Sequence, residues 1–582
     1  MPPETRTCET CRQAFVVEPD DIARFELLKV PKPRRCHQCL LAQRLAFRNE
    51  RTLYKRKCDA PGHSEEIISN YAPDAQCPVY DIKFWWSDEW DPMDAGREYD
   101  FSKPFFAQLK ELSRKVPSVA LLNLNAVNSD YCNFTTDNKN CYLVFGGDFN
   151  EDCSYSTFNF VSKDVLDTYF VNKCELCYEL VDSEACYRVR FGRYVENCSD
   201  CMFVYDCIGC TNCIGCVGLR NKSYYIFNQA YSKEEYQKEI EKLALGTRAG
   251  LASVRTRFDS LRGSLPHRYA HIFKSVDCTG DNISNASNVK DSFDVAGQAQ
   301  NLHHFFLGGW DMKDSCYGNH SGHGTELMYN SFAIFSGCSR VVGSLLVSSS
   351  QNILYSWTCR GSSNLFGCVG LRNKQYCILN KQYSKKEYEM LVPKIVQHMD
   401  AMPYVLNGNQ YLYGDFLPPD LSLAGYNETI ANEYFPLDRD QAVASGFNWR
   451  ERENNIYTPT TAGNTLPGSI QEIEDSILNE TIACLHEGDC DHHCTKAFRF
   501  ISSELAFYRH LNLPLPQLCP NCRHYERVAQ RNPLRLWTRK CDCAAVNHAH
   551  NDSPCANEFQ TSYAPERPEV VYCEQCYNVE VV

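Results

Sequence analysis

The amino-acid sequence contains no uninterrupted apolar run long enough to cross a lipid bilayer. Its first residues, MPPETRTCETCRQAF, also lack the apolar segment of a signal peptide. No catalytic signature dominates the chain. These absences argue against a membrane protein, a secreted protein and an enzyme of a familiar class. We therefore expect a soluble cytoplasmic protein with no membrane partner.

Cysteine, by contrast, is abundant, at 34 of 582 residues. Disulfide bonds would be the first interpretation in a small secreted chain, but cysteines spaced as CxxC in a long intracellular chain indicate metal ligands. Hydrophobic residues make up 43% of the chain, which permits real cores. Because 582 residues exceed the size of one core, we expect roughly three or four domains.

Residues 11–59 recur near the other end of the chain as residues 494–542, at a constant offset of 483 and without a gap. The matching residues of the first copy are Cys11, Phe15, Cys36, Cys39, Arg44, Arg48, Asn49, Leu53, Arg56, Lys57, Cys58 and Asp59. Those of the second copy are Cys494, Phe498, Cys519, Cys522, Arg527, Arg531, Asn532, Leu536, Arg539, Lys540, Cys541 and Asp542. One cysteine-rich module therefore stands at each end.

The N-terminal module carries two CxxC pairs, Cys8 with Cys11 and Cys36 with Cys39, separated by 24 residues. Four thiolates at this spacing are typical of a closed, tetrahedral structural zinc site. A catalytic zinc ion usually keeps three protein ligands and one water, whereas four cysteines leave no vacant position. The sequence thus predicts a structural metal ion.

The stretch CETCRQAFVVEPDDIARFELLKVPKPRRCHQC resembles the probable zinc-ribbon family: a CxxC pair, a Phe, a short helix, and a Pro with a basic pair before the second CxxC. Beyond it, RNERTLYKRKCD and the later repeats resemble uncharacterised multi-cysteine bacterial proteins with zinc-ribbon or treble-clef-like domains at both ends. This resemblance implies zinc and repeats, and it supplies no established activity.

The net charge of −13 is unevenly distributed. Ten Lys or Arg residues between Lys29 and Lys57 face the single acid Glu50, and six between Arg523 and Lys540 face Glu526. Such basic stretches with interleaved aromatic residues suit a nucleic-acid backbone, although a solvated charged face is the simpler alternative. The candidate nucleic-acid contacts are Arg34, Arg35, Arg44, Arg48, Arg51, Lys55, Arg56, Lys57, Arg523, Arg527, Arg531, Arg535, Arg539 and Lys540.

From Tyr131 onward the sequence consists of short units in which Asn or Asp precedes Cys and an aromatic residue, recurring about every ten to thirteen residues. A second copy follows at an offset of 152, since GCVGLRNK at 215–222 returns at 367–374. Internal repetition of this kind predicts stacked coils, and hence two tandem β-solenoids.

One run of these cysteines, Cys198, Cys201, Cys207, Cys210, Cys213 and Cys216, superficially resembles an iron–sulfur ligand set. In the second copy the same positions hold Ser350, Ile353, Cys359, Ser362, Leu365 and Cys368, which cannot form an equivalent cluster. Because cysteine also behaves as a small hydrophobe, we interpret these thiols as packing of a narrow interior, with Asn and Asp at the corners.

Each solenoid is expected to end in a charged helix that begins with a capping box, Ser232 with Glu235 in the first and Ser384 with Glu387 in the second. The second copy also contains His303, His304, His320, His323 and Asp314, a set that suggests a metal or acid–base site. The first copy has no equivalent histidines, so scattered surface residues are the favoured interpretation.

The C-terminal module supplies Cys490, Cys494, Cys519 and Cys522 as the expected ligands of a second zinc ion, although its first pair is spaced CxxxC. Cys484, His492 and His493 lie close enough in the sequence for one of them to replace Cys490.

A third site is expected from Cys541, Cys555, Cys573 and Cys576, with Cys543, His548 and His550 as alternative ligands. At an offset of 492, Cys555, Cys573 and Cys576 fall opposite His63, Asp81 and Phe84. The N-terminal copy of this region is therefore predicted to keep the scaffold and to lose the metal.

We expect a mainly β protein with some α-helix, in which two tandem β-solenoid (β-helix-like) repeat domains with helical caps are flanked by small zinc-ribbon or treble-clef-like modules. The predicted domains are a zinc module with a basic strand (1–78), an aromatic-rich helical cap (79–128), the first solenoid with its capping helix (129–240), a helical connector (241–275), the second solenoid with its capping helix (276–400), an extended linker (401–480) and a double zinc module (481–582).

The leading hypothesis is a non-enzymatic scaffold that holds about three zinc ions and grips RNA or DNA with its two basic modules. The alternatives are a protein-interaction scaffold that uses the solenoid faces, a β-helix enzyme acting on an acidic polysaccharide, and a metal-storage protein, which would hold many more ions.

Overall fold

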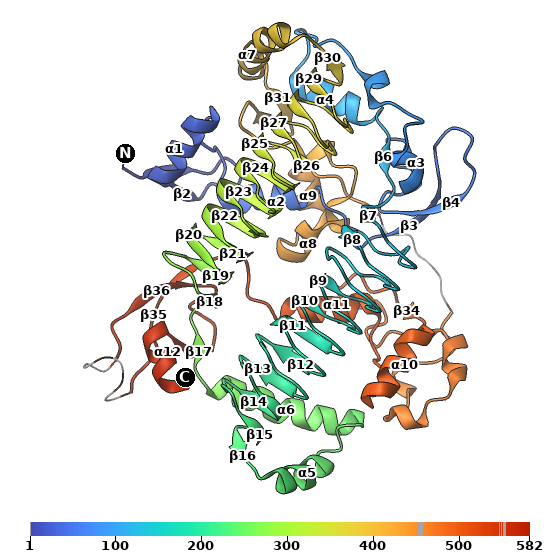
Figure 1. Cartoon of the computed structure of the whole chain (residues 1–582), viewed down its shortest axis with the longest axis vertical. Coiled ribbons are helices and arrows are strands. Elements are labelled where there is room, and N and C mark those ends of the chain that lie inside the picture. Colours follow the sequence, from blue (N-terminus) through green and yellow to red (C-terminus); the bar gives the residue numbers. More distant parts are fainter. Residues whose placement is uncertain (1, 452–457, 546–547, 549, 551–553, 582) are drawn as a thin grey trace.

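The computed structural model describes residues 2–451, 458–545, 548, 550 and 554–581. Two stacks of parallel strands form the middle of the molecule, and helices and small hairpins lie at their ends and sides (Figure 1). We call residues 123–230 the first stack and residues 272–382 the second stack. Among the residues that the structure describes, no helix is both long enough and apolar enough to cross a membrane.

In the first stack, neighbouring strands pair in parallel and in the order of the sequence. Residues one coil apart are paired, as in Tyr169 with Val181 and Arg193 with Tyr205, so each coil contains twelve residues. The strands are β7 (Asn123–Leu124), β8 (Thr135–Thr136), β9 (Thr157–Phe160), β10 (Tyr169–Asn172), β11 (Tyr178–Glu184), β12 (Arg190–Arg193), β13 (Met202–Tyr205), β14 (Thr211–Val217), β15 (Ser223–Ile226) and the antiparallel β16 (Gln229–Ala230).

The second stack repeats this plan with longer coils in its middle, between Ala286 and Ser348. Phe293 pairs with Phe306, thirteen residues on, whereas Ile353 pairs with Leu365, twelve residues on. Its strands are β18 (Ile272–Phe273), β19 (Gly280–Ser284), β20 (Ala286–Lys290), β21 (Ser292–Ala296), β22 (Ala299–Gly309), β23 (Lys313–Ser321), β24 (Glu326–Phe335), β25 (Ser339–Val342), β26 (Leu345–Ser348), β27 (Gln351–Leu354), β28 (Ser363–Phe366), β29 (Gln375–Ile378) and β30 (Lys381–Gln382).

The coils turn so tightly because about every third residue adopts a left-handed backbone conformation, as at Asn125 (φ 53°) and Asn128 (φ 49°). Asn and Asp tolerate this conformation better than most side chains. They also pair from coil to coil, since the Asn128 amide donates to Asn140 at 3.1 Å and the Asn140 amide donates to Asp152 at 3.0 Å. These ladders offset part of the backbone strain.

The interior of the first stack consists almost entirely of buried Cys and Val side chains. Their thiols donate hydrogen bonds to backbone carbonyl groups, as Cys186 does to Glu184 at 3.3 Å and to Val195 of the next coil at 3.4 Å. In the second stack, Ile353 and Leu365 are buried at the positions of Cys201 and Cys213. The packing role predicted for these cysteines therefore agrees with the structure.

Each stack ends in a capped helix, as the sequence predicts. Helix α5 (Lys233–Lys242) begins with the capping box of Ser232 and Glu235, and α7 (Lys385–Ala401) with that of Ser384 and Glu387. The two helices lie at opposite ends of the molecule (Figure 1). Helix α6 (Arg248–Ser264) lies between the two stacks in the sequence, in the segment predicted to be a helical connector.

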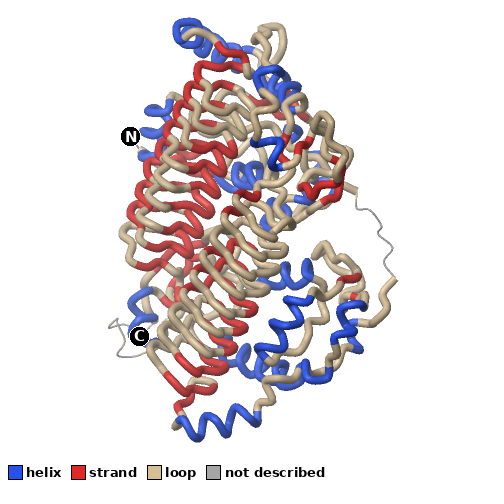
Figure 2. Tube along the Cα trace, turned by 45° about the vertical axis from the view of Figure 1, so that its right-hand side comes forward, coloured by secondary structure: helices blue, strands red, loops and turns tan. Residues whose placement is uncertain are grey.

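The two stacks lie side by side over the middle of the molecule (Figure 2), and the order of their strands runs in opposite directions (Figure 1). Ring contacts join Phe158 to His320 and Phe160 to Trp310, with centroids 5.4 and 6.1 Å apart. The sequence predicts both stacks but not this pairing, because contacts between residues so far apart in the chain leave no local pattern.

The duplicated ends of the chain fold into matching elements. The N-terminal module (residues 4–45) contains β1 (Glu4–Thr7), β2 (Ala14–Val17), α1 (Pro19–Leu28) and α2 (His37–Leu45). The C-terminal module (residues 482–529) contains β33 (Ile482–Ala483), β34 (Ala497–Phe498), α10 (Ser502–Leu511) and α11 (Pro520–Ala529). Helices α1 and α2 contact β23 and β24 of the second stack, whereas α11 contacts β10 of the first stack.

The segments that follow these modules also match each other. Residues 54–86 contain β3 (Tyr54–Lys57), β4 (Glu66–Ser69), β5 (Val79–Tyr80) and α3 (Ile82–Trp86). The final module (residues 537–581) contains β35 (Trp537–Lys540), β36 (Glu558–Thr561), β37 (Val571–Tyr572) and α12 (Glu574–Val581). Strand β37 pairs with β17 (His267–Arg268), just before the second stack.

The aromatic-rich segment 79–128 contains η1 (Pro92–Ala95), α4 (Phe105–Ser113) and β6 (Ser118–Val119). The ring of Phe105 lies 5.1 Å from that of Phe366, and Arg372 donates to the carbonyl oxygen of Trp86 at 2.9 Å. Both contacts are with the second stack. This segment therefore packs on the second stack, although the first stack directly follows it in the sequence.

The segment after α7 is packed rather than extended over residues 404–444. It forms β31 (Tyr404–Leu406), β32 (Asn409–Tyr411), α8 (Ile430–Tyr434) and α9 (Arg439–Ala444), with short 3-10 turns η2 (Pro419–Leu421) and η3 (Tyr426–Glu428). Phe416 is buried against Phe332 of the second stack. Farther on lie η4 (Gly463–Thr465), η5 (Ile470–Glu472) and η6 (Asp475–Asn479). Residues 452–457 of the predicted linker lie outside the described residues.

Candidate metal centres

The four cysteines of the N-terminal module come together. Cys8 follows β1, Cys11 lies in the hairpin turn, and Cys36 and Cys39 begin α2. Their sulfur atoms lie within 4.8 Å of one another, and those of Cys11 and Cys36 are 3.8 Å apart. Metal–sulfur bonds of about 2.3 Å in a tetrahedron separate two sulfurs by about 3.8 Å. The predicted ligand set therefore has the spacing that a tetrahedral metal ion requires.

Two features of this site favour thiolate ligands. The backbone N–H of Cys36 donates to the sulfur of Cys8 at 3.3 Å. A hydrogen bond from the Cys39 thiol has the largest effect on the pKa of Cys36 and lowers it to about 5. Burial of Cys36 acts in the opposite direction and raises the pKa. Since the thiolate is the metal-binding form, the site is prepared for a cation.

In the C-terminal module the four converging cysteines are Cys484, Cys494, Cys519 and Cys522. Cys484 directly follows β33, as Cys8 follows β1. The backbone N–H of Cys519 donates to the sulfur of Cys484 at 3.2 Å, as the N–H of Cys36 does to the sulfur of Cys8. The structure thus places Cys484 where the sequence interpretation expects Cys490. The seven residues inserted between the two cysteines of the first pair, relative to the N-terminal module, hide this equivalence.

The third predicted set is also assembled, because the sulfurs of Cys541, Cys555, Cys573 and Cys576 lie within 4.8 Å of one another. Cys541 follows β35, and Cys573 and Cys576 flank the start of α12. The N–H of Cys573 donates to the sulfur of Cys541 at 3.2 Å. All three modules therefore use the same backbone arrangement around their cysteines.

The N-terminal counterpart of this third site keeps the scaffold, as predicted. Asp81 replaces Cys573, and its N–H donates to the sulfur of Cys58 at 3.3 Å. The His63 ring nitrogen lies 3.4 Å from the Asp81 carboxylate. Phe84 stands where Cys576 stands in the other copy, and its ring packs edge-on against His63 at 4.8 Å. An apolar ring thus takes the place of the fourth ligand.

Six of the fourteen basic residues proposed to bind nucleic acid are buried: Arg35, Arg44, Arg48, Arg56, Arg523 and Arg527. The side chain of Arg531 is buried as well, at 5% exposure. Arg34, Arg51 and Arg539 are partly exposed, and Lys55, Lys57, Arg535 and Lys540 are exposed. A buried guanidinium cannot reach a phosphate unless the packing opens. The predicted nucleic-acid contacts are therefore corrected for the arginines that α2 and α11 present to the stacks.

On the N-terminal side, Arg44 of α2 donates to Asn319 of β23 at 2.8 Å and to Asn330 of β24 at 2.9 Å. On the C-terminal side, Asp167 receives hydrogen bonds from both Arg523 and Arg527 of α11, and its side chain is fully buried. The arginine-bearing helices that begin at these converging cysteines are therefore docking elements.

Arg531, in the turn after α11, contacts both stacks. Its guanidinium lies 2.9 Å from Asp182 of the first stack and 2.6 Å from Asp294 of the second stack. All three side chains are at most 5% exposed. Burial is the main cause that raises the pKa of Asp294, so this carboxyl group depends on the cation beside it. The C-terminal module therefore joins the stacks through a buried ionic bridge.

The histidines of the second stack have structural contacts too. His303 lies 2.9 Å from Asp21 of α1, and His304 lies 3.1 Å from Asp291. His323 stacks on Trp310 with centroids 5.6 Å apart. Asp314 accepts a hydrogen bond from Asn301 within a corner ladder, and His320 packs between Phe158 and Phe306. His303 and His304 meet at Asp21, whereas His320, His323 and Asp314 have other partners.

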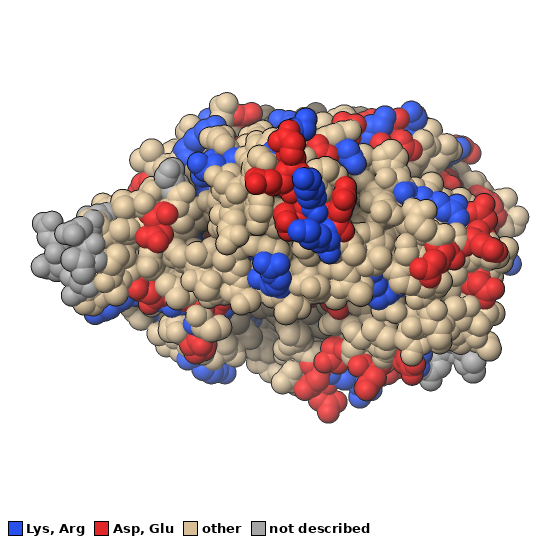
Figure 3. Space-filling model, turned by 90° about the horizontal axis from the view of Figure 1, so that it is seen from below, with Lys and Arg blue, Asp and Glu red and all other residues tan. Residues whose placement is uncertain are grey.

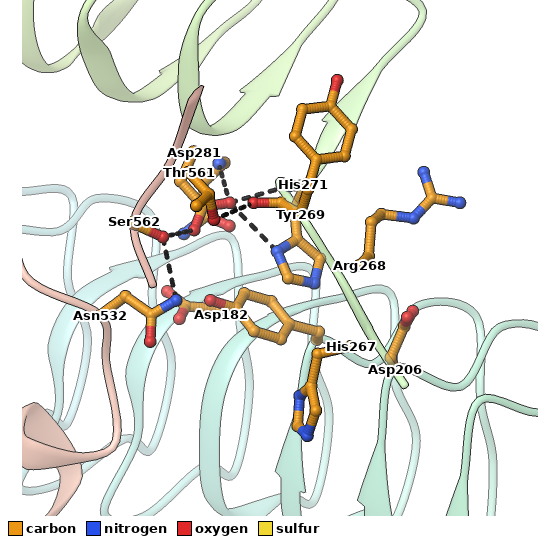
Figure 4. A network of polar contacts seen from close by, with 12 residues as sticks. Asp182, Asp206, His267, Arg268, Tyr269, His271, Asp281, Asn532, Thr561 and Ser562 are labelled. Carbon is orange, nitrogen blue, oxygen red and sulfur yellow. Dashed lines mark hydrogen bonds and ion pairs between the residues drawn. The ribbon is translucent and has the colours of Figure 1, made fainter. Parts of the chain in front are cut away.

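The final module is tied to both stacks by a network of polar contacts (Figure 4). Asp281 of β19 accepts hydrogen bonds from the His271 ring at 3.1 Å and from the Ser562 hydroxyl at 2.6 Å. The Asn532 amide donates to Ser562 at 2.9 Å. The His271 ring stacks on Tyr194 of the first stack, with centroids 3.5 Å apart. Candidate metal ligands and stack contacts thus lie within one small module.

Neither comparison with protein-family models nor comparison with curated proteins gives a match for this chain. The cysteine clusters at both ends could hold metal ions, and their arrangement is the functional evidence that the molecule itself provides.

Proposed function

We propose that this protein is a non-enzymatic, zinc-stabilised scaffold in which terminal zinc-ribbon-like modules lock two β-solenoids into one rigid body. Closed sets of four cysteines suit structural zinc, because they leave no position for a substrate. The repeating coils of twelve and thirteen residues support the solenoid interpretation.

One observation carries this proposal: the helix that begins at a metal-binding CxxC pair leads directly to Arg531, which bridges the two stacks. Holding α11 in place at its first turn fixes the position of this bridge. The zinc ion thus determines how the two solenoids are arranged, because it fixes α11, the helix that leads to the bridging Arg531.

Replacing Arg531 by Met tests this role. Two buried carboxyl groups would lose their shared cation, and breaking a buried ion pair costs about 3–5 kcal/mol. We expect an earlier urea midpoint and, in small-angle X-ray scattering, a larger maximum dimension as the stacks separate. Arg535→Ala, four residues on at an exposed position, should change neither.

A triple variant tests whether the instability of Arg531→Met comes from the stranded carboxylate charges or from the changed side-chain volume. Adding Asp182→Asn and Asp294→Asn to Arg531→Met removes the stranded charges and should recover part of the stability. Wild-type scattering and stability in Arg531→Met alone would contradict the proposed bridge.

Nucleic-acid binding is a second candidate, supported by the exposed cations of the repeated hairpins. Lys55 and Lys57 lie on β3, Lys540 lies on β35, and Arg535 lies just before β35. Strands β3 and β35 are on opposite sides of the molecule (Figure 1). On the face seen from below, Lys and Arg are interspersed with Asp and Glu (Figure 3). The candidate surface is therefore two small patches, which a long strand could contact together.

A salt series of binding to duplex and single-stranded nucleic acid tests this candidate. With about four phosphate contacts on a duplex, the logarithm of the binding constant should fall with a slope near −4 against the logarithm of salt concentration. Lys55→Glu with Lys57→Glu should roughly halve that slope. Lys385→Glu with Lys386→Glu, on the capping helix α7, is the matched control. Binding that is absent or insensitive to salt would rule out this candidate.

A further inference from the structure

The C-terminal module differs from its N-terminal copy by an insertion rich in metal ligands. Two residues separate Cys8 from Cys11, whereas nine separate Cys484 from Cys494. The longer segment contains His486, Cys490 and His492. The two hairpins are otherwise equivalent, since β1 pairs with β2 as β33 pairs with β34.

These three inserted residues converge on a cysteine that already belongs to the four-cysteine set. The ligand atoms of His486, Cys490, His492 and Cys522 lie within 4.8 Å of one another. The sulfur of Cys522 is 3.8 Å from that of Cys484 on one side and 3.8 Å from that of Cys490 on the other. Both distances equal the sulfur–sulfur separation of about 3.8 Å across a tetrahedral zinc ion.

The imidazole groups of the insertion have nitrogen atoms that the described protein leaves unsatisfied. The Nδ1 atoms of His486 and His492 are buried and have no hydrogen-bond partner among the described residues. A buried polar atom without a partner costs about 1–3 kcal/mol. The ring of His492 is held by parallel stacking on Tyr525, at 5.5 Å and 4°. A metal ion bound to these nitrogens would remove the penalty.

We propose that Cys522 is a bridging thiolate that belongs to two zinc ions at once, one held by the four cysteines and one by His486, Cys490, His492 and Cys522. A thiolate sulfur has enough lone pairs to bind two cations. Five thiolates with neutral imidazoles and two divalent ions leave one net negative charge. This inference rests on the proposed function in taking zinc as the metal.

The final module repeats the same design in an independent place. Four residues separate Cys58 from His63, whereas thirteen separate Cys541 from Cys555, and the longer segment carries Cys543, His548 and His550. With Cys576 these form a second group whose ligand atoms lie within 4.8 Å. The sulfur of Cys543 lies 3.3 Å from His548 Nδ1 and 3.4 Å from His550 Nε2. Cys576 is the last cysteine of its module, as Cys522 is of the other.

Each insertion thus supplies one cysteine and two histidines, and each shares the final cysteine of the four-cysteine set. The full chain therefore holds about five zinc ions, one in the N-terminal module and two in each of the others. The sequence predicts about three, because it treats these histidines and extra cysteines as alternative ligands of one ion.

Elemental analysis of the full-length protein, purified with zinc and freed of excess ions, measures this directly. The wild type should contain about five zinc ions per chain, and the variant with His486→Ala and His492→Ala should contain about four. His510→Ala, on the exposed side of α10, should keep the wild-type count. X-ray absorption of the zinc should show metal–metal scattering at about 3.5–4 Å.

The outcomes separate this inference from the function on which it rests. About three zinc ions per chain, or an unchanged count in the double histidine variant, would overturn the bridged centre and leave the scaffold proposal intact. A protein that binds no zinc would overturn both. Loss of two ions in Cys522→Ser, with the other centres still loaded, would support the bridge.

Discussion

Removal of zinc is expected to unfold the N-terminal, C-terminal and final modules while the interiors of the two stacks stay folded. A structural zinc ion contributes about 10–16 kcal/mol of apparent binding free energy to a small module at neutral pH. The modules consist of two short strands and short helices around their cysteines, so apart from their packing on the stacks little else holds them. The stacks have separate buried cores of Cys, Val, Ile and Leu.

Scanning calorimetry with and without a strong chelator measures this effect. We expect an early transition to appear in the chelated protein and to vanish when zinc is restored. The chelator saturated with zinc beforehand is the control, because it leaves the protein-bound ions in place. A thermogram that does not change on complete loss of metal would show that the cysteine sets are only packing.

Asp167→Asn is expected to destabilise the protein by about 3–5 kcal/mol, the range for breaking a buried ion pair. The Asp167 carboxylate faces Arg523 and Arg527 and is fully buried. Arg523 retains Glu504 at 3.2 Å, but burial raises the pKa of Glu504 to about 7, against the opposing effect of Arg523. Glu504 pairs with Arg523, so one carboxyl group is left for two buried guanidinium groups.

Urea unfolding of the zinc-loaded protein checks this prediction. The matched control is Asp475→Asn, which removes the partner of Arg509 at an exposed pair in the same module. An exposed pair contributes about 0–1 kcal/mol, so this change should have little effect. Equal midpoints for Asp167→Asn and Asp475→Asn would mean that α11 is not anchored by its buried arginines.

Much of the fold follows from patterns that repeat along the chain. The constant offset between the two ends predicts the matching modules, and the spacing of the Asn, Cys and aromatic units predicts the coils. Comparison of Cys201 with Ile353 indicates that the interior cysteines pack rather than bind a cluster, and both side chains are buried. These inferences succeed because the repeats supply an internal comparison within one sequence.

The use of the arginines could not be predicted in the same way. Arg523 and its acid Asp167 are 356 residues apart, and no local pattern links them. A cluster of positive charge has the same appearance in sequence whether it faces phosphate or buried carboxylates. The place of Cys484 was hidden for a different reason, since the insertion beside it shifts the CxxC spacing by seven residues.

The central claim is that metal ions in the end modules hold the two stacks together, and hydrogen exchange tests it most directly. In the zinc-loaded protein, the amides of α11 and of β10, the strand that it contacts, should exchange slowly. After chelation, the account predicts fast exchange in α11, whereas β10, β13 and β14 stay protected by their pairing inside the first stack. Slow exchange of α11 in the metal-free protein would contradict it.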